Sequence, residues 1–415
     1  MTQKLGKELK SQFPIFRNNV RVENNGRTRP LVYLDSAVSA QKPQVVIDAI
    51  KHHLEFDYGS VHRGAYHLSI TSSEMYETVR KKCANFVGVP ESQIIFTKGT
   101  TEGINILSNG FAREMLTEND RIIVPVSEHH ANFVPWQQAA LYKNCEIAYI
   151  PLVGTHGNDL KLNLAEAKKL ITKNTKVITL ASMGNVLGQI NPVAEIVEMA
   201  KKVGAYIFVD AAQSASCLEV DYFAMGVDAV AFSGHKLYGP SGIGILAMSK
   251  ELMEKLPPLL YGGGMISSVT LEESTWINGP AKFEAGTPPI TEVAGLGAAI
   301  DWVLDIGRHN IHSHSSHLAS IFIEELKKLP FIELFAPETG QETIVSFRHK
   351  TIHAHDLATI LDSFHVSMRA GHHCAWPLIR TLGVDALLRC SFAAYSDEED
   401  IAIALEGIKG TTNLF

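Results

Sequence analysis

Cysteine is scarce in this sequence of 415 residues, and the few that occur are spread out. The five cysteines, with no CxxC pair among them, are Cys83, Cys145, Cys217, Cys374 and Cys390. An odd and sparse set in a chain of this length argues against a disulfide framework. We therefore expect a protein of a reducing compartment.

Long apolar runs and an excess of basic residues are also missing. No stretch approaches the roughly 18 apolar residues that a membrane span needs, and the charged first residues have no apolar run behind them, which argues against a signal peptide. The formal net charge is -7. Composition thus gives no electrostatic case for binding nucleic acid or an anionic membrane. We expect a cytoplasmic protein whose partners are small molecules or other proteins.

Short apolar segments alternate with helical ones along the first part of the chain. With 46% hydrophobic and 20% charged residues, the chain has enough apolar material for two globular domains. The expected strands are 93–97, 121–126, 146–150, 176–182, 205–210 and 229–233. Strands separated by helices such as 192–203 form βαβ units. This pattern predicts an α/β domain around a mainly parallel sheet, covered on both faces.

The same patterns predict three parts of the chain. Residues 1–30 are expected to form an N-terminal arm that joins the small domain, with a polar helix and a turn at Asn24-Asn25-Gly26. Residues 31–295 are expected to form the large domain, and 296–415 a smaller C-terminal α/β domain. The elements expected around this boundary and beyond it are helices 291–307, 312–329 and 355–364 and strands 344–348 and 366–369.

An acid and a lysine follow two of the expected strands. Strand 205–210 ends in Asp210, and strand 229–233 leads through Ser233 and His235 to Lys236. Ligand-binding residues of a doubly wound sheet gather at the carboxyl ends of its strands. Pyridoxal 5′-phosphate (PLP) requires this pair, because a lysine amine forms a Schiff base with it and a carboxylate keeps its pyridine nitrogen protonated. A helix cap at Asp210 and a surface charge at Lys236 are the alternatives, and the glycine-rich turns around Lys236 disfavour them.

A glycine- and threonine-rich turn precedes a helix at 98–103. The run Lys98-Gly99-Thr100-Thr101-Glu102-Gly103 follows an apolar strand. It offers backbone N–H groups and hydroxyls at the positive end of a helix, which suits a phosphate group. Taken alone, this turn is weak evidence.

Motifs along nearly the whole chain resemble those of one enzyme group. They are Tyr33-Leu34-Asp35-Ser36-Ala37, Val61-His62-Arg63-Gly64, Gly99-Thr100-Thr101-Glu102, Glu128-His129-His130-Ala131-Asn132, Asn185-Val186-Leu187-Gly188, Asp210–Gln213, Ser233–Pro240, Phe283-Glu284-Ala285-Gly286-Thr287-Pro288 and Arg369-Ala370-Gly371-His372-His373-Cys374-Ala375. The sequence resembles the fold-type I PLP enzymes of the class V aminotransferase group, and among them the type II cysteine desulfurases of the SUF system. The cysteine of the last motif is the most discriminating residue.

The resemblance implies a fold and a set of roles. It implies a large domain with a mainly parallel seven-stranded sheet, PLP as cofactor, and a homodimer. Lys236 would be the Schiff-base lysine, with His129 on the ring face as a second catalytic residue. The residues implied to bind the cofactor are Asp210, Gln213, Thr100, Thr101, Ser233, His235, Asn185 and, from the neighbouring subunit, Thr287. The residues implied to bind the substrate are Arg389, Asn185, Arg369 and His62.

Cys374 needs a chemical role of its own. In a desulfurase a thiolate takes sulfur from L-cysteine as a persulfide and leaves L-alanine. The neighbouring Arg369, His372 and His373 are candidates to stabilise that thiolate. A zinc site of His372, His373 and Cys374 is the competing interpretation, which is disfavoured because adjacent ligands converge poorly on one tetrahedral ion. A second group, of His309, His312, His314 and His317, is interpreted as a solvated helix surface.

The sequence also departs from the resembled pattern. The departures, which border the expected pocket, are Val38, Met183-Gly184, Pro289 and Ser396. They leave the catalytic class intact and bear on substrate preference and rate.

We therefore expect a cysteine desulfurase whose persulfide passes to a SufE-like or SufU-like acceptor for iron–sulfur cluster assembly. The compact segment around Cys374 implies a nucleophile of limited reach, which an acceptor would have to approach. Selenocysteine lyase and cysteine sulfinate desulfinase activity on the same scaffold are alternatives. A non-catalytic scaffold is disfavoured by the presence of both Lys236 and Cys374.

Overall fold

The computed structural model describes residues 5–22, 28–62, 64–154, 160–219, 221–337, 339–340 and 342–411. The turn expected at Asn24-Asn25-Gly26 lies outside these ranges, as does Arg63 of one motif. No helix in the described ranges is long and apolar enough to cross a membrane.

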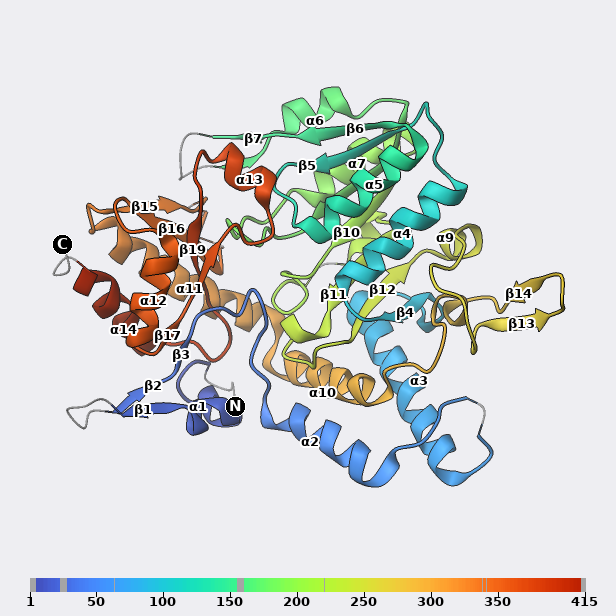
Figure 1. The fold of residues 1–415 in the computed structure, drawn as a ribbon, viewed down its shortest axis with the longest axis horizontal. Coiled ribbons are helices and arrows are strands. Elements are labelled where there is room, and N and C mark those ends of the chain that lie inside the picture. The colour runs from blue at the N-terminus through green and yellow to red at the C-terminus, as the bar shows by residue number, and fades with distance from the viewer. Residues whose placement is uncertain are drawn as a thin grey trace.

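A seven-stranded sheet forms the centre of the large domain (Figure 1). Its strands, in spatial order, are β4 (Ile94–Thr97), β12 (Gly244–Met248), β11 (Ala229–Ser233), β10 (Tyr206–Asp210), β9 (Thr175–Ala181), β5 (Arg121–Pro125) and β6 (Glu146–Ile150). β12 runs antiparallel to both of its neighbours, and the other pairs are parallel. The predicted α/β fold with a mainly parallel sheet is confirmed. Sequence patterns missed β12, which begins at the last glycine of a glycine-rich turn.

Helices cover both faces of this sheet because its strands are apolar on both sides. Along β5, Ile122 and Val124 belong to one buried cluster and Ile123 to the other, as the alternation of a strand requires. The helices of the first face are α4 (Thr100–Glu114), α5 (Val134–Lys143) and α9 (Lys250–Lys255). Those of the second face are α3 (His67–Val87), α7 (Val193–Val203) and α10 (Ile290–Ile306). Polar side chains that follow these strands therefore lie at the ends of the sheet, outside its apolar core.

The C-terminal part of the chain forms a second sheet with its own core (Figure 1). Its four antiparallel strands, in spatial order, are β15 (Ile332–Phe335), β16 (Ile344–His349), β19 (Leu387–Ser391) and β18 (Arg369–Gly371). Its helices are α11 (Arg308–Lys327), α12 (Ala354–Ser363) and α14 (Glu398–Gly410). The strand expected at 366–369 is divided in two: β17 (Val366–Ser367) pairs with β3 (Val32–Tyr33), and only Arg369 enters the sheet.

Residue 295, the expected domain boundary, lies inside α10. The α10 side chains Val293, Leu296, Ile300 and Val303 are buried in the same cluster as the large sheet. By packing, the whole of α10 belongs with the large domain. The division of the chain at residues 30 and 295 stays a prediction.

The N-terminal segment, expected as an arm that joins the small domain, packs on the rest of the protein through a few buried side chains, and its assignment as an arm stays a prediction. Two short helices, η1 (Leu9–Gln12) and α1 (Pro14–Asn18), lead to the strand pair β1 (Val20–Val22) and β2 (Thr28–Pro30). Phe13 is fully buried, with its ring 4.9 Å from that of Tyr395 and 5.5 Å from that of Trp302. Apolar contacts therefore hold this segment in place, together with the ion pairs of Lys10 with Asp397 and Asp400.

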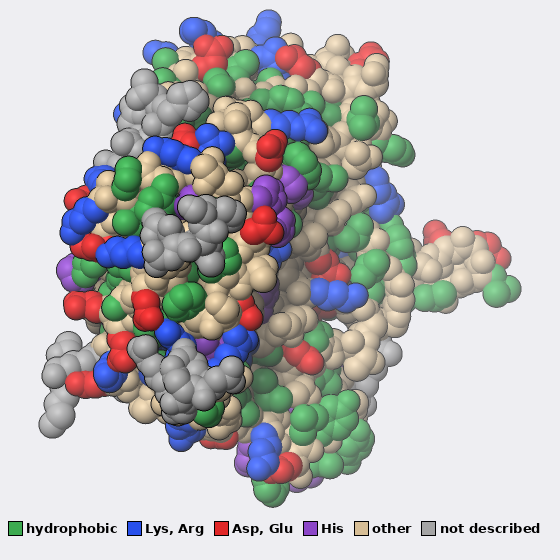
Figure 2. Space-filling view, turned by 60° about the vertical axis from the view of Figure 1, so that its left-hand side comes forward, with side chains coloured by type: hydrophobic (Ala, Val, Ile, Leu, Met, Phe, Trp, Pro, Cys, Tyr) green, Lys and Arg blue, Asp and Glu red, His purple; other side chains and the backbone are tan. Residues whose placement is uncertain are grey.

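The hairpin of β13 (Ile266–Val269) and β14 (Ser274–Trp276) stands away from the rest of the protein (Figure 2). Leu271 at its tip is fully exposed. The remaining described elements are α2 (Gln44–His52), η2 (His53–Asp57), η3 (Glu91–Gln93), η4 (His130–Asn132), β7 (Leu152–Val153), β8 (Lys161–Leu162), α6 (Leu164–Leu170), α8 (Tyr222–Met225), η5 (Gly234–Lys236), η6 (Pro280–Phe283) and α13 (Trp376–Thr381).

Candidate active site

The carboxyl ends of β9, β10 and β11 meet residues of the small domain at one pocket of about 220 Å³. All but two of the predicted site residues line this pocket. The predicted residues that line it are Lys236, Cys374, His129, Asp210, Gln213, Thr100, Thr101, Ser233, His235, Asn185, Arg369 and Arg389. The remaining two, Thr287 and His62, line a separate cavity together. The departures Val38 and Met183 lie in the wall of the pocket.

Asp210 and Lys236 face the pocket from neighbouring strands. Asp210 is the last residue of β10, and one carboxylate oxygen accepts a hydrogen bond of 2.8 Å from the backbone N–H of Ala212. Burial lowers the pKa of Lys236 to about 8, although the carboxylate of Asp210 acts in the opposite direction. Burial also raises the pKa of Asp210, against the charge of Lys236. An amine with a lowered pKa is more often unprotonated and hence nucleophilic near neutral pH.

The amino end of α4 closes one end of the pocket. Its helical residues begin at Thr100, and the N-cap residue, Gly99, has no side chain that could cap the helix. The Ser233 hydroxyl accepts from the backbone N–H of Thr100 at 2.9 Å and lies 2.8 Å from the Thr100 hydroxyl. The backbone N–H groups that follow Thr100 and the two hydroxyls, at a positive helix end, form a site for an anion such as phosphate.

His129 is held in a neutral, defined tautomer. Its Nδ1 accepts a hydrogen bond of 3.0 Å from the backbone N–H of Ala131, so the ring proton of the neutral form resides on Nε2. Burial, followed by the charge of Lys236, lowers the pKa of His129 to about 3. A neutral, half-buried imidazole in the pocket wall is suited to packing against a flat ring.

A buried network beneath the pocket supports His129. The carboxyl of Glu128, which is fully buried, accepts from the side chain of Asn132 at 2.6 Å and from the backbone N–H of Ala181 at 2.9 Å. The amide oxygen of Asn132 in turn accepts from the hydroxyl of Thr179 at 2.6 Å. Burial raises the pKa of Glu128 to about 8. These contacts join the turn that carries His129 to the end of β9.

Arg389 already has a carboxylate partner within the chain. Its Nη1 donates to the backbone oxygen of Asn185 at 2.7 Å, and its Nη2 lies 3.2 Å from Oδ1 of Asp35. The side chain is 2% exposed, and its Nε has no hydrogen-bond partner. Asp35 thus supplies a counter-charge to this buried arginine from within the chain. The guanidinium nevertheless lines the pocket and keeps donor capacity for an anion.

The segment around Cys374 forms a tight turn at the mouth of the pocket. His373 and Cys374 have backbone φ angles of 52° and 55°, a left-handed conformation that residues with side chains rarely adopt. The side chain of Asn185 donates to the backbone oxygen of His373 at 2.7 Å. Cys374 itself is exposed and also lines a larger groove beside α4 and α5. The thiol therefore lies between the enclosed pocket and the open surface.

The two histidines before Cys374 lie in different environments. Burial lowers the pKa of His373 to about 3, so this ring is neutral and supplies no positive charge to a thiolate. Its Nε2 lies 3.1 Å from the backbone oxygen of Leu387, whereas His372 stacks on Trp376 with ring centroids 3.7 Å apart. Of the predicted cations, Arg369 lines the pocket together with Cys374. In the described ranges, no three His, Cys, Asp or Glu side chains lie together as metal ligands.

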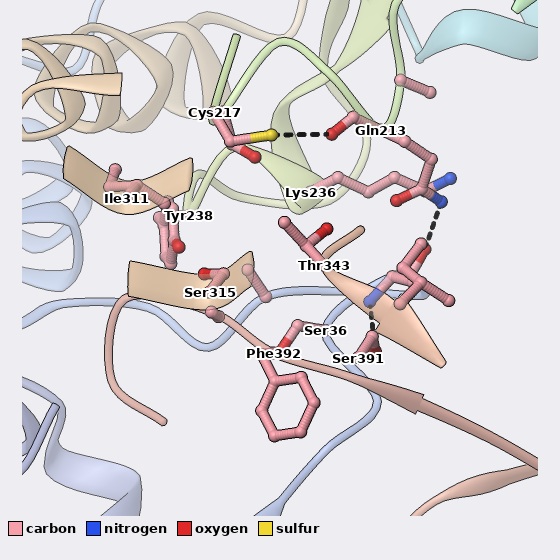
Figure 3. A pocket seen from close by; sticks show the side chains of 16 residues that line it. Ser36, Gln213, Cys217, Lys236, Tyr238, Ile311, Ser315, Thr343, Ser391 and Phe392 are labelled. Atoms are coloured by element: carbon pink, nitrogen blue, oxygen red, sulfur yellow. Dashed lines mark hydrogen bonds between the residues drawn. The ribbon is translucent and has the colours of Figure 1, made fainter. Parts of the chain in front are cut away.

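A second, smaller cavity of about 30 Å³ lies behind Lys236, between the two domains. Figure 3 shows Gln213 and Lys236 reaching it from the large domain, and Thr343, Ser391 and Phe392 from the small domain. Nε2 of Gln213 donates to the backbone oxygen of Ala37 at 2.8 Å. One of the two amide hydrogens of Gln213 is therefore engaged, and the other is left for a partner in the main pocket.

Glu284 and His314 make contacts that the sequence analysis did not predict. Glu284, in the motif before Thr287, binds the guanidinium of Arg80 through both carboxylate oxygens at 2.7 and 2.9 Å, and it accepts from the backbone N–H of Phe96 at 2.7 Å. This carboxylate fixes the motif onto β4. His314 is not a solvated surface residue, because its Nε2 lies 2.8 Å from the backbone oxygen of Ser396. No local sequence signal marks either contact, since both join distant parts of the chain.

Comparison with known proteins agrees with this geometry. The chain matches the family described as aminotransferase class-V over residues 32–403. It is 41% identical over 409 residues to a probable cysteine desulfurase of Halalkalibacterium halodurans, with 98% of each chain covered. The solved cysteine desulfurase CsdA of Escherichia coli, in an S-sulfonic acid form, is 34% identical with a TM-score of 0.89 over 98% of each chain. The apo cysteine desulfurase of Thermococcus onnurineus is 31% identical with a TM-score of 0.92, covering 100% of this chain and 99% of that one.

The protein belongs to the class-V aminotransferase family. Within it, these relatives and solved structures, which are similar to the protein over nearly the whole chain, carry the name cysteine desulfurase.

Proposed function

We propose that this protein is a cysteine desulfurase that converts L-cysteine to L-alanine and captures the sulfur as a persulfide on Cys374. The observation that carries the proposal is the position of Cys374 at the mouth of a pocket that also contains Lys236, Asp210 and Arg389. A thiol, an amine, an acid and a guanidinium around one enclosed space match the needs of this reaction.

The pocket fits PLP, the cofactor of this family. The amino end of α4 with Thr100 and Ser233 suits its phosphate, and Asp210 suits its pyridinium nitrogen. Lys236, whose pKa burial lowers to about 8, is the amine for its aldehyde. When bound, PLP supplies an electron sink for bonds at the carbon atoms of an amino acid. His129, Thr101, His235 and Gln213 complete the proposed wall around it.

Substrate binding is assigned to the guanidinium of Arg389 and the side chain of Asn185. A guanidinium binds a carboxylate through two parallel hydrogen bonds, which orients the amino acid as well as holding it. Arg389 is pre-positioned by Asn185 and Asp35, so little freedom is lost when substrate binds. Lys236, as a free amine, is placed to accept and return protons within the pocket.

Sulfur transfer is assigned to the thiolate of Cys374. It attacks the sulfur of the substrate, an S–S bond forms, and the C–S bond of the substrate breaks. The electron pair of that bond stays with the β-carbon, which takes up a proton and becomes the methyl group of alanine. A thiolate of an acceptor protein then attacks the outer sulfur of the persulfide and returns Cys374 to its thiolate.

The experiment that tests this function incubates the purified holoenzyme with L-cysteine and measures alanine together with the mass of the Cys374 peptide. Equal amounts of alanine and of a peptide heavier by one sulfur atom are expected in the first turnover. Turnover without a modified Cys374, or no alanine at all, would contradict the proposal. Parallel assays with selenocysteine and cysteine sulfinate decide between the desulfurase and its alternatives on this scaffold.

A homodimer is proposed from the separate location of Thr287 and His62. Both are exposed, and they line a cavity distinct from the pocket that contains Lys236. Exposed aromatic residues lie nearby in sequence to His62, with Phe56 63%, Tyr58 58% and Tyr66 53% exposed. Such a patch favours coverage by another chain. In a homodimer, Thr287 of one protomer would reach the phosphate of its partner.

The acceptor is proposed to be a SufE-like or SufU-like protein of an iron–sulfur assembly system in the cytoplasm. The support is the short, hydrogen-bonded turn around Cys374, which limits how far the persulfide can travel. An acceptor must then bring its own thiol to the mouth of the pocket. Faster alanine production on addition of such an acceptor, without a change in the first turnover, is the expected result.

A further inference from the structure

His130 binds the turn that carries Cys374 through two hydrogen bonds, one from its backbone and one to its ring. Its backbone N–H donates to the backbone oxygen of Cys374 at 2.7 Å, and its ring Nε2 accepts from the backbone N–H of Trp376 at 3.0 Å. One residue of the large domain thus binds the main chain at positions 374 and 376. These two bonds complement the bond from Asn185 to His373 on the other side of the thiol.

The bond to Trp376 satisfies a specific need of the chain. Trp376 is the first residue of α13, whose N-cap residue, Ala375, has no side chain able to accept a hydrogen bond. The ring of His130 takes the place of that missing cap from another domain. Burial and the charge of His372 lower the pKa of His130, which favours the neutral ring that this acceptor role requires.

The turn needs such support because it is strained. His373 and Cys374 are consecutive residues with positive φ, and neither is glycine. A chain held in this conformation returns to a more favourable one unless its surroundings fix it. The bonds from His130 and Asn185 act on the three residues 373, 374 and 376, so they fix the direction in which the thiol points.

We infer that His130 is a positioning residue for sulfur transfer, which orients Cys374 through the main chain of the 373–376 turn. This inference rests on the proposed role of Cys374 as the sulfur acceptor. His130 does not line the PLP pocket, in contrast to its neighbour His129. Its loss therefore affects sulfur transfer and not cofactor binding.

Three substitutions of His130 test whether the bond from its ring to Trp376 matters, as distinct from the volume of the side chain. A glutamine carries a polar atom about as far from the backbone as Nε2 of histidine, whereas an asparagine is too short, and an alanine has none. His130→Gln, His130→Asn and His130→Ala leave the backbone bond to Cys374 in place and change only the bond to Trp376. His309→Ala, which removes an exposed histidine of α11, is the matched control.

The first measurement is amide hydrogen exchange of the peptide that contains Trp376 in the full-length holoenzyme. We expect exchange there to accelerate about tenfold in the Asn and Ala variants, as loss of one hydrogen bond predicts. The Gln variant and the control should match the native protein. Core strands such as β10 should exchange at the native rate in all four variants.

The second measurement is the single-turnover rate of persulfide formation on Cys374, beside the KM for L-cysteine and the PLP absorption band. The rate should fall about tenfold in the Asn and Ala variants, with KM and PLP content unchanged, and Gln should restore it. Native exchange and native rates in all three variants would overturn the inference, as would equal impairment of all three. If the native enzyme forms no persulfide, the proposed function fails, and the exchange result still decides whether His130 holds the turn.

Discussion

Oδ1 of Asp35 lies 3.2 Å from Nη2 of Arg389, and this pair joins the chain near the N-terminus to β19, one of the two inner strands of the small sheet. Burial raises the pKa of Asp35, and the charge of Arg389 opposes that shift. The contacts with Asp35 and Asn185 therefore orient the guanidinium before any substrate arrives. A substrate carboxylate would share Arg389 with Asp35.

Arg389→Lys tests this arrangement. A lysine keeps the charge and loses the planar pair of donors, so we expect kcat/KM for L-cysteine to fall about 100-fold, mostly through KM. Steady-state kinetics give the split, and thermal unfolding shows whether the fold is retained. An unchanged KM in a folded variant would show that another residue binds the carboxylate.

Cys374→Ala separates cofactor chemistry from sulfur capture. PLP binding should be retained, because Lys236 and Asp210 are untouched, whereas alanine production from L-cysteine should fall by about three orders of magnitude or more for want of a nucleophile. Selenium leaves more readily than sulfur, so turnover of selenocysteine should partly survive. The measurement is the ratio of the two activities in native protein and variant. If both fall in parallel, Cys374 has a structural role instead.

The lowered pKa of Lys236 predicts a pH dependence for PLP attachment. Only the unprotonated amine attacks an aldehyde, and burial lowers the pKa from 10.5 to about 8. The rate at which the apoprotein binds PLP covalently should therefore rise with pH and level off above about 8, not above about 10 as for an ordinary lysine. Stopped-flow absorbance follows the reaction, and Lys236→Ala, which lacks the amine, is the control. A rate that still rises steeply between pH 9 and 10 would contradict the shift.

Mixed dimers test the proposed contribution of Thr287 to its partner's site. Thr287→Ala should weaken PLP binding, and Lys236→Ala should abolish turnover. When the two variants are combined, each mixed dimer contains one site with both substitutions and one site with neither. Activity should therefore recover on mixing and re-association. No recovery in confirmed mixed dimers would place both residues in the same subunit's site.

Glu284→Gln tests a contact outside the pocket. The carboxylate is buried against Arg80, with side chains 10% and 7% exposed, and it also accepts from the backbone of Phe96. Removal of its charge leaves the buried guanidinium with only the half-exposed carboxylate of Glu77 as an ionic partner, which costs about 1.5–3 kcal/mol. Chemical denaturation should show that loss in the free energy of unfolding. A loss below about 1 kcal/mol, the range of exposed ion pairs, would show that solvent reaches Arg80.

The part of the site that sequence predicted best lies at strand ends. Asp210 and Lys236 follow apolar strands, and strand order alone brings such ends to one edge of the sheet. The contacts that sequence missed join segments far apart in the chain. Asp35 with Arg389, and His130 with Trp376, follow from how the two domains meet, which no local pattern encodes. β12 was missed because its glycine-rich approach resembles a loop.

The N-terminal segment is a second case in which contacts with distant parts of the chain are not evident from local composition. Its composition predicted an arm, since Lys7, Glu8 and Lys10 dominate it. Phe13 inserts between Tyr395 and Trp302, and Lys10 pairs with Asp397 and Asp400 at the start of α14. Apolar and charged contacts together therefore place this polar segment, and an average over its composition conceals both.

Lys236 lines both the main pocket and the small cavity behind it, in a wall that it shares with Ala37, Ala212 and Gln213. Truncation to alanine removes part of that shared wall as well as the amine. The standard substitution therefore alters shape and chemistry at once. Lys236→Met keeps the length of the side chain and removes only the amine, which makes it the variant that isolates the chemistry.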